Sequence, residues 1–184
     1  ALTDHGNMNG FAYQVQHARA MIKEGKDFKP IFGVEAYFLP SIDDWREQLE
    51  KAKADKKAKK NIDKSQAGTT IEDESTKREV KNILNRRRHL ILLAQNQKGL
   101  NNIFSLVSKS YGADNFYRFP RMDYDMLKEH SEGVIAASAC LGGVLAGNYW
   151  ENIESGEKAV LTAMRDTTEN MVSVFGDRWY GELQ

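Results

Sequence analysis

Short apolar segments typical of β-strands alternate along this chain with amphipathic segments typical of α-helices. The strand-like segments are KPIFGVEAYFLP at 29–40, HLILLAQN at 89–96, GVIAASAC at 133–140 and RWYGELQ at 178–184. Apolar residues recur at helical spacing over 10–24, from Leu100 onward and from Val160 onward, and each pattern indicates a helix. Because strands separated by helices pair in parallel through crossover connections, this order predicts a parallel sheet in an α/β fold, either a barrel or an open sheet.

Residues 41–88 interrupt this alternation with a long charged segment. Its first part, DDWREQLEKAKADKKAKKN, is rich in helix formers and begins with acidic residues, which suits a capped, solvated helix. A loop and a second helix, TKREVKNILNRRR, are expected to follow. We interpret 41–88 as a lysine-rich surface insertion. Its lysines form either a solvated face, which such charge runs usually are, or a phosphate-contacting patch together with Arg86, Arg87 and Arg88.

The composition limits the classes of protein to which this chain can belong. With 184 residues, of which 41% are hydrophobic, it can bury one core and is expected to form one domain or most of one. The formal net charge is zero, which leaves any electrostatic partner to a local patch. The single cysteine, Cys140, excludes an internal disulfide, and no apolar run approaches the roughly 20 residues of a membrane span. We therefore expect a cytoplasmic protein without a membrane partner.

Both ends of the sequence fall inside the predicted pattern. ALTDHGNMNG begins, without a methionine, at what we interpret as the end of a buried strand, and RWYGELQ ends while a strand is still running. We therefore expect 1–184 to be a partial domain from a longer chain.

Three side chains that can bind a metal are expected at one rim of the sheet. His5 follows the first strand, Glu35 lies in or near the end of the second, and Cys140 ends VIAASAC. In parallel α/β folds the functional groups gather at the carboxyl ends of the strands, so these three should converge. Imidazole, carboxylate and thiolate together suit zinc or another borderline transition metal, with Asp4 as a further ligand or an orienting group.

Each of these residues also has a structural interpretation. Asp4 with Gly6 is a common turn pair, and a lone cysteine such as Cys140 is more often a small buried apolar residue than a ligand. Glu35 is harder to explain in this way, since a carboxylate in an apolar strand requires a partner or a metal. His89 opens HLILLAQN, which is the wrong end of a parallel strand, so its spacing alone does not make it a ligand.

Five stretches, in order, resemble the PHP (polymerase and histidinol phosphatase) domain of bacterial replicative DNA polymerase III alpha subunits. They are ALTDHGNMNG, KPIFGVEAYF, RRRHLILLAQNQKGLNNIFSLVSKSY, FPRMDYDMLKEHSEGVIAASACLGG and GDRWYGELQ. The resemblance covers nearly the whole chain except the insertion, and it implies a distorted, TIM-like (β/α)7 barrel with up to three divalent metal ions, zinc, manganese or magnesium, at one mouth. The ligands that it implies here are His5, Glu35, His89 and Cys140, so it supports His89 where the argument from spacing does not.

For the parent chain, the resemblance implies DNA-directed DNA polymerase activity in replication and hydrolysis of phosphodiesters at a DNA 3′ end, that is, 3′-to-5′ exonuclease proofreading. A metal-activated water would attack the phosphate, and Arg121 in FPRMD either contacts a phosphate or forms a structural salt bridge. The implied partners are primer-template DNA, the sliding clamp and a proofreading subunit. The alternatives are a non-catalytic scaffold that stabilises the polymerase and docks a proofreading partner, and a free-standing phosphatase of small monoesters. The fragment alone is expected to be inactive.

Overall fold

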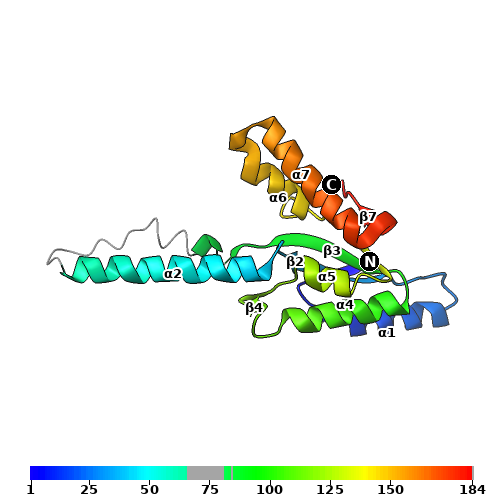
Figure 1. The fold of residues 1–184 in the computed structure, drawn as a ribbon. Helices are drawn as coiled ribbons and strands as arrows, with labels where there is room; N and C mark the ends of the chain where they lie inside the picture. Colours follow the sequence, from blue (N-terminus) through cyan, green and yellow to red (C-terminus); the bar gives the residue numbers. More distant parts are fainter. Residues whose placement is uncertain (66–80, 84, 184) are drawn as a thin grey trace.

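Five strands form one sheet against which helices pack, in a computed structural model that describes residues 1–65, 81–83 and 85–183 (Figure 1). The strands of the sheet are β1 (Leu2–His5), β2 (Phe32–Phe38), β3 (Arg88–Ala94), β6 (Val134–Ala137) and β7 (Trp179–Tyr180). The helices are α1 (Phe11–Lys23), α2 (Ile42–Ser65), α4 (Gln97–Ser110), α5 (Tyr124–Glu129), α6 (Val144–Asn152) and α7 (Glu157–Phe175). A short hairpin of β4 (Phe116–Tyr117) and β5 (Phe119–Pro120) follows α4. Within the described ranges, no helix has the length and apolar character needed to cross a membrane.

The sheet has the strand order β1-β2-β3-β6-β7 and is mixed, so the expectation of an all-parallel sheet is wrong. β1 and β2 are parallel, as are β6 and β7, but β3 runs antiparallel to both of its neighbours. The reason lies in the connections. The start of β3 pairs with the end of β2, since the chain returns after α2 at the same edge. The end of β3 likewise pairs with the start of β6, because the chain leaves this edge through α4 and returns to it through α5. The sheet formed by the described strands is open, with β1 and β7 at its edges.

Alternate strand residues build one hydrophobic core on one face of the sheet. Val34, Ala36 and Phe38 of β2 face this core together with Leu90 and Leu92 of β3, and each is at most 2% exposed. Residues of α4, α5 and α7 complete the same cluster, and α1 lies beside α4 beneath the strands in Figure 1. The residues between them in β2 and β3 point to the opposite face, because successive strand side chains alternate. That opposite face carries the candidate site.

The first half of α2 packs on the rest of the protein through one apolar face. Its buried residues recur at helical spacing and form a second cluster with Leu39 and Ile83: Ile42, Trp45, Leu49 and Ala52. The Trp45 Nε1 donates a 2.7 Å hydrogen bond to the backbone oxygen of Ile83. The helix expected to be solvated is therefore anchored along this face. The expected loop and the start of the second helix fall among residues 66–80, outside the described residues, and the lysines from Lys56 to Lys60 have no described side chains.

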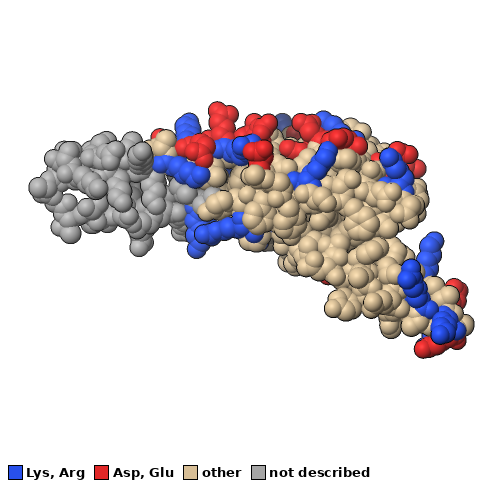
Figure 2. Space-filling model, turned by 90° about the horizontal axis from the view of Figure 1, so that it is seen from below, with Lys and Arg blue, Asp and Glu red and all other residues tan. Residues whose placement is uncertain are grey.

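Charged side chains of both signs are interspersed on the surface. Figure 2, which views the molecule from below, shows Lys and Arg beside Asp and Glu around an uncharged centre. Arg46, for example, lies 3.0 Å from Asp114, and Lys109 lies 2.6 Å from Glu129. This face therefore carries no large field of one sign, which agrees with the zero net charge.

Candidate metal centre

Glu35, His89 and Cys140 meet on the face of the sheet opposite the core. The His89 Nδ1 lies 2.6 Å from the Glu35 Oε1 and 3.4 Å from the Cys140 Sγ. One ligand atom from each residue lies within 4.8 Å of the other two, and all three residues are half-buried. Carboxylate, imidazole and thiolate are ligands that zinc and other borderline metals accept, so this group can hold a divalent cation.

The direction of β3 explains how His89 joins this group. His89 lies opposite Tyr37 in the register of β2 and β3, and Glu35 lies two residues before Tyr37 on the same face. Because β3 is antiparallel to β2, its first residues lie beside the last residues of β2. The objection to His89 that parallel strands raised therefore does not apply.

The turn after β6 brings Cys140 to His89. The His89 backbone N–H donates a 2.9 Å hydrogen bond to the Gly142 oxygen, and the Gly142 N–H donates to the Cys140 Sγ at 3.4 Å. Ala139 has a φ of 60°, in the left-handed region that non-glycine residues rarely adopt, and this turns the chain just before the thiol. A Cβ on Gly142 would lie 3.3 Å from the His89 ring, so any larger residue there would crowd this ring.

His5 lies on the other side of the Glu35 carboxylate. Its Nε2 is 3.3 Å from the Glu35 Oε2, and its ring centroid is 5.8 Å from that of His89. The side chain of His5 is 64% exposed, whereas those of Glu35 and His89 are 14% and 20% exposed. The structure thus brings all four sequence-predicted residues together, with Glu35 between two imidazoles and His5 at the open side.

The Glu35 carboxylate shows whether a cation fits these residues. Its Oε1 is buried and has no hydrogen-bond donor in bonding geometry, although the His89 Nδ1 is only 2.6 Å away. No N–H of His89 points from the Nδ1 to the Glu35 Oε1, so the lone pairs of both atoms are available to one bound cation. Since a buried acceptor without a donor is unfavourable, a cation held by the Glu35 Oε1, the His89 Nδ1 and the Cys140 Sγ would relieve it. The donor set fits a metal.

The charge state of His89 agrees with a ligand role. Burial lowers the pKa of His89 from its usual 6.5, and the nearby charges of His5 and Arg87 lower it further, against the opposing effect of Glu35. A lowered pKa keeps the imidazole neutral near pH 7, and the neutral ring is the form that binds metals.

Asp4 has a structural role instead. It alternates with His5 along β1 and so points to the opposite face, where its Oδ2 accepts a 2.7 Å hydrogen bond from the Gly10 N–H at the start of α1. The motif TDHG therefore combines one residue of the candidate site with one that fixes the helix behind it.

Arg121 is also structural, and the partners of its guanidinium among the described residues include three carbonyl groups. Its guanidinium donates to the backbone oxygens of Tyr117, Phe119 and Arg86 at 2.9, 3.1 and 3.3 Å, and it stacks on the Trp45 ring at 4.2 Å. Burial, with a smaller effect of a neighbouring arginine, lowers its pKa from 12.5 to about 10. Since Arg121 is 0% exposed, it has no surface to offer a phosphate, which corrects the phosphate contact considered from the sequence.

Two further residues border the site, Tyr37, which no sequence motif indicated, and Arg87, which the sequence did not distinguish from Arg86 and Arg88. The Tyr37 ring lies 5.5 Å from the His89 ring and 6.4 Å from the His5 ring. The Arg87 guanidinium lies 5.0 Å from the Tyr37 ring centroid. Strand alternation could have predicted both residues on the face of the candidate site, because Tyr37 follows Glu35 by two positions and Arg87 precedes His89 by two.

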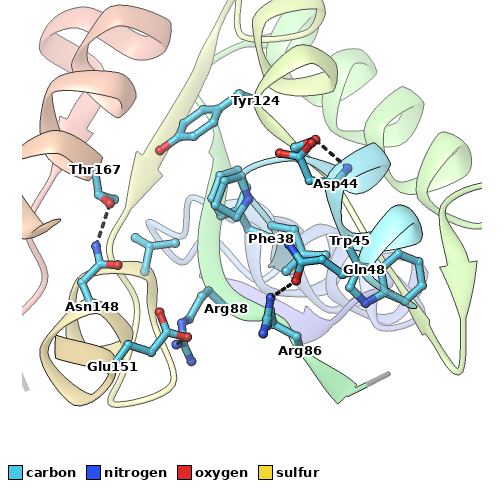
Figure 3. Close-up of a pocket in the computed structure, with 14 residues that line it drawn as sticks. Phe38, Asp44, Trp45, Gln48, Arg86, Arg88, Tyr124, Asn148, Glu151 and Thr167 are labelled. Carbon is cyan, nitrogen blue, oxygen red and sulfur yellow. Dashed lines mark hydrogen bonds and ion pairs between the residues drawn. The ribbon is translucent and has the colours of Figure 1, made fainter. Parts of the chain in front are cut away.

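A pocket of about 350 Å³ lies on the core side of β3 rather than at the candidate metal centre (Figure 3). Its lining includes Arg86, whose Nη1 donates to the Gln48 side chain at 2.8 Å, and Arg88, which forms an ion pair with Glu151. Because none of the residues of the candidate metal centre lines this pocket, the two features are separate.

Known proteins resemble the chain along its whole length. The PHP domain family matches residues 1–184. DNA polymerase III subunit alpha of Aquifex aeolicus is 33% identical over 183 residues, that of Deinococcus radiodurans 30% over 184, and that of Borreliella burgdorferi 34% over 187. Each alignment covers 100% of this chain but only 11% or 12% of the relative, so the chain spans about an eighth of the length of these proteins. On the whole-length match, the chain belongs to the PHP domain family.

Proposed function

We propose that this chain is the PHP domain of a DNA polymerase III alpha subunit and that the longer protein acts in DNA replication. The support is the match over residues 1–184 and the 30–34% identity to proteins of that name. For the longer protein we propose DNA-directed DNA synthesis, with primer-template DNA, the sliding clamp and a proofreading subunit as partners. We further infer that the open sheet is part of a distorted (β/α)7 barrel.

Within this domain we propose a centre for divalent cations, zinc, manganese or magnesium, held by Glu35, His89 and Cys140 with His5 at its open side. When bound, such a cation lowers the pKa of a coordinated water and polarises a phosphate oxygen. The chain prepares the site in two ways. Burial keeps His89 neutral, and the Gly142 N–H orients the Cys140 Sγ.

The activity that we propose is hydrolysis of the phosphodiester at a DNA 3′ end, that is, 3′-to-5′ exonuclease activity. The observation that carries it is the convergence of three chemically different ligand atoms within 4.8 Å. The exposed position of His5 supports access for a large substrate. The buried Glu35 Oε1 without an aligned donor also supports a bound cation, since folded proteins rarely leave such an acceptor unpaired.

The test measures metal content and nuclease activity in the same preparations of the full-length protein that carries this domain. Wild type is compared with a Glu35→Ala, Cys140→Ala double variant by elemental analysis and by shortening of a 5′-labelled oligonucleotide. Glu169→Ala, which removes an exposed carboxylate of α7, is the matched control. We expect wild type and control to hold metal and shorten the strand, and the double variant to lose both properties. Metal loss with unchanged nuclease activity would contradict the proposal.

A second candidate function is a non-catalytic scaffold that stabilises the polymerase and docks a proofreading partner. One observation favours it: Glu35 contacts both His5 and His89 directly, so the group is held together by its own side chains. In that case the double variant lowers the thermal midpoint of the protein while its nuclease activity stays at the wild-type level.

A further inference from the structure

Arg87 lies beside the candidate metal centre with a positive charge that no carboxylate among the described residues neutralises. Its guanidinium carbon is 3.8 Å from the centroid of the Phe119 ring and 5.0 Å from that of the Tyr37 ring. Tyr37 in turn lies 5.5 Å from the ring of His89. The Phe119 ring, at this short distance, holds the guanidinium in place and leaves its edges for hydrogen bonds.

One edge of this guanidinium forms a hydrogen bond, and another has no hydrogen-bond partner among the described residues. The Nη1 donates a 2.9 Å hydrogen bond to the backbone oxygen of Asn85. The Nε is buried and has no hydrogen-bond partner in the described part of the chain, which is unfavourable for a polar atom. In arginine, the Nε and Nη2 hydrogens form a fork that matches two oxygens of a phosphate. Among the described residues, the Nε and Nη2 of Arg87 therefore form a donor pair without an acceptor.

The charges around Arg87 also favour an anion. The Tyr37 ring contacts both the Arg87 guanidinium, at 5.0 Å, and the His89 ring, at 5.5 Å, so the positive charge lies one side chain away from the candidate centre. A divalent cation at the candidate centre would add to this positive charge, and an anion lying between the cation and Arg87 would be attracted by both.

The neighbouring arginines do not share this position. Arg86 is exposed and donates to the Gln48 side chain at 2.8 Å. Arg88 alternates to the core side of β3, where it forms an ion pair with Glu151. Of the three consecutive arginines, only Arg87 faces the candidate centre.

We propose that Arg87 is the phosphate-binding residue of this centre, with its Nε and Nη2 edge holding two oxygens of a phosphoryl group that also faces Glu35, His89 and Cys140. The inference rests on the proposed function and adds to it the group that recognises the substrate. The phosphoryl group belongs either to a DNA strand or to free phosphate, which have the same chemistry at this edge. Because the Nε is closed to solvent, binding of the anion requires the Arg87 side chain to shift so that this edge becomes accessible.

The test is calorimetric titration of the full-length protein, freed of metal with a chelator, with inorganic phosphate and separately with a single-stranded oligonucleotide. Arg87→Met removes the charge and the fork, Arg87→Lys keeps the charge, and Arg86→Gln is the matched control one residue away. We expect Arg87→Met to weaken phosphate binding by about tenfold or more, Arg87→Lys to be intermediate, and Arg86→Gln to stay within about twofold of wild type.

The outcomes separate this inference from the proposed nuclease. Wild type that does not bind phosphate, or Arg87→Met that binds it like wild type, overturns the inference even if nuclease activity is present. Phosphate binding through Arg87 in a protein without nuclease activity supports the inference and refutes the proposed function. Weakened binding of phosphate but not of the oligonucleotide identifies free phosphate as the ligand. If Arg87→Met does not fold, Arg87→Lys decides, since it retains the charge and the ring contact.

Discussion

Replacing Arg121 by leucine tests whether this arginine holds the fold or a phosphate. The guanidinium is 0% exposed, donates to three described backbone oxygens at 2.9, 3.1 and 3.3 Å, and stacks on Trp45 at 4.2 Å. These contacts join the β4–β5 hairpin to α2 and to the residues before β3. Leucine fills part of the volume but leaves the three oxygens without this donor.

The expected loss of stability follows from two opposing effects. Each hydrogen bond to a charged donor contributes about 1.5–3 kcal/mol, and a buried group left without its partner costs about 1–3 kcal/mol. Leucine, however, also removes the unfavourable burial of a cation, which is visible in the pKa of Arg121 at about 10. We expect a net loss of about 3–5 kcal/mol, since three carbonyl oxygens lose this donor while only the cost of burying the cation is recovered. A domain that is stable by about 5–15 kcal/mol would then be close to its limit.

Hydrogen exchange in the full-length protein measures this effect where it should occur. We expect the amides of residues 37–45 and 119–123 to exchange faster in Arg121→Leu, while Arg86→Leu, which replaces an exposed arginine, leaves them unchanged. Phosphate binding by any folded fraction should match wild type. Unchanged exchange together with weakened phosphate binding would refute the structural interpretation of Arg121.

Three further predictions concern packing, pH and metal. A Cβ on Gly99 would overlap the backbone of Gly133, so Gly99→Ala should lower the free energy of unfolding by about 1–3 kcal/mol despite a helix-propensity gain of about 1 kcal/mol. Urea denaturation measures this loss, and Gly181→Ala, with open space around it, should leave stability unchanged. Burial, with a smaller effect of Lys109, lowers the pKa of His130, so the unfolded chain binds more protons than the folded chain below about pH 6.5. The free energy of unfolding should therefore fall as the pH drops through that value, and it should fall less steeply in His130→Gln. A chelator should lower the thermal midpoint of wild type and should have no effect on that of Cys140→Ala. If free metal is at a hundred times its Kd, its removal lowers the free energy of unfolding of wild type by about 2.7 kcal/mol.

The sequence predicted the positions of the strands better than their directions. The apolar runs at 29–40 and 133–140 contain β2 and β6, and the run at 89–96 contains all of β3 except Arg88, because burial of alternate side chains leaves a local pattern. Strand direction depends on how often the chain crosses the sheet between two strands, and no local pattern records this number. The same limit explains Arg121, since the Arg86 carbonyl group and the Trp45 ring that contact it come from segments distant in sequence.

The position of His89 was supported by family resemblance and contradicted by spacing, and the structure shows which assumption failed. A parallel β3 would have placed His89 at the far edge from Glu35. The antiparallel pairing places the two residues on one face, with His89 opposite Tyr37. His5, Glu35 and Cys140 were expected together because all three lie at the carboxyl ends of strands. His89 could be placed with them only once the direction of β3 was known, and the register of β2 and β3 supplies this direction.

The register of β3 also decides which of its charged residues reach the candidate centre. Leu90 and Leu92 are fully buried on the core side of the sheet. A slip of one residue would turn both leucines to the open face and would carry His89 into the core, so the burial of two leucines opposes it strongly. Arg87 and His89 are therefore held toward Glu35 by apolar residues that have no part in the proposed chemistry. Replacing Leu90 and Leu92 by smaller apolar residues should loosen this register and weaken metal and phosphate binding together.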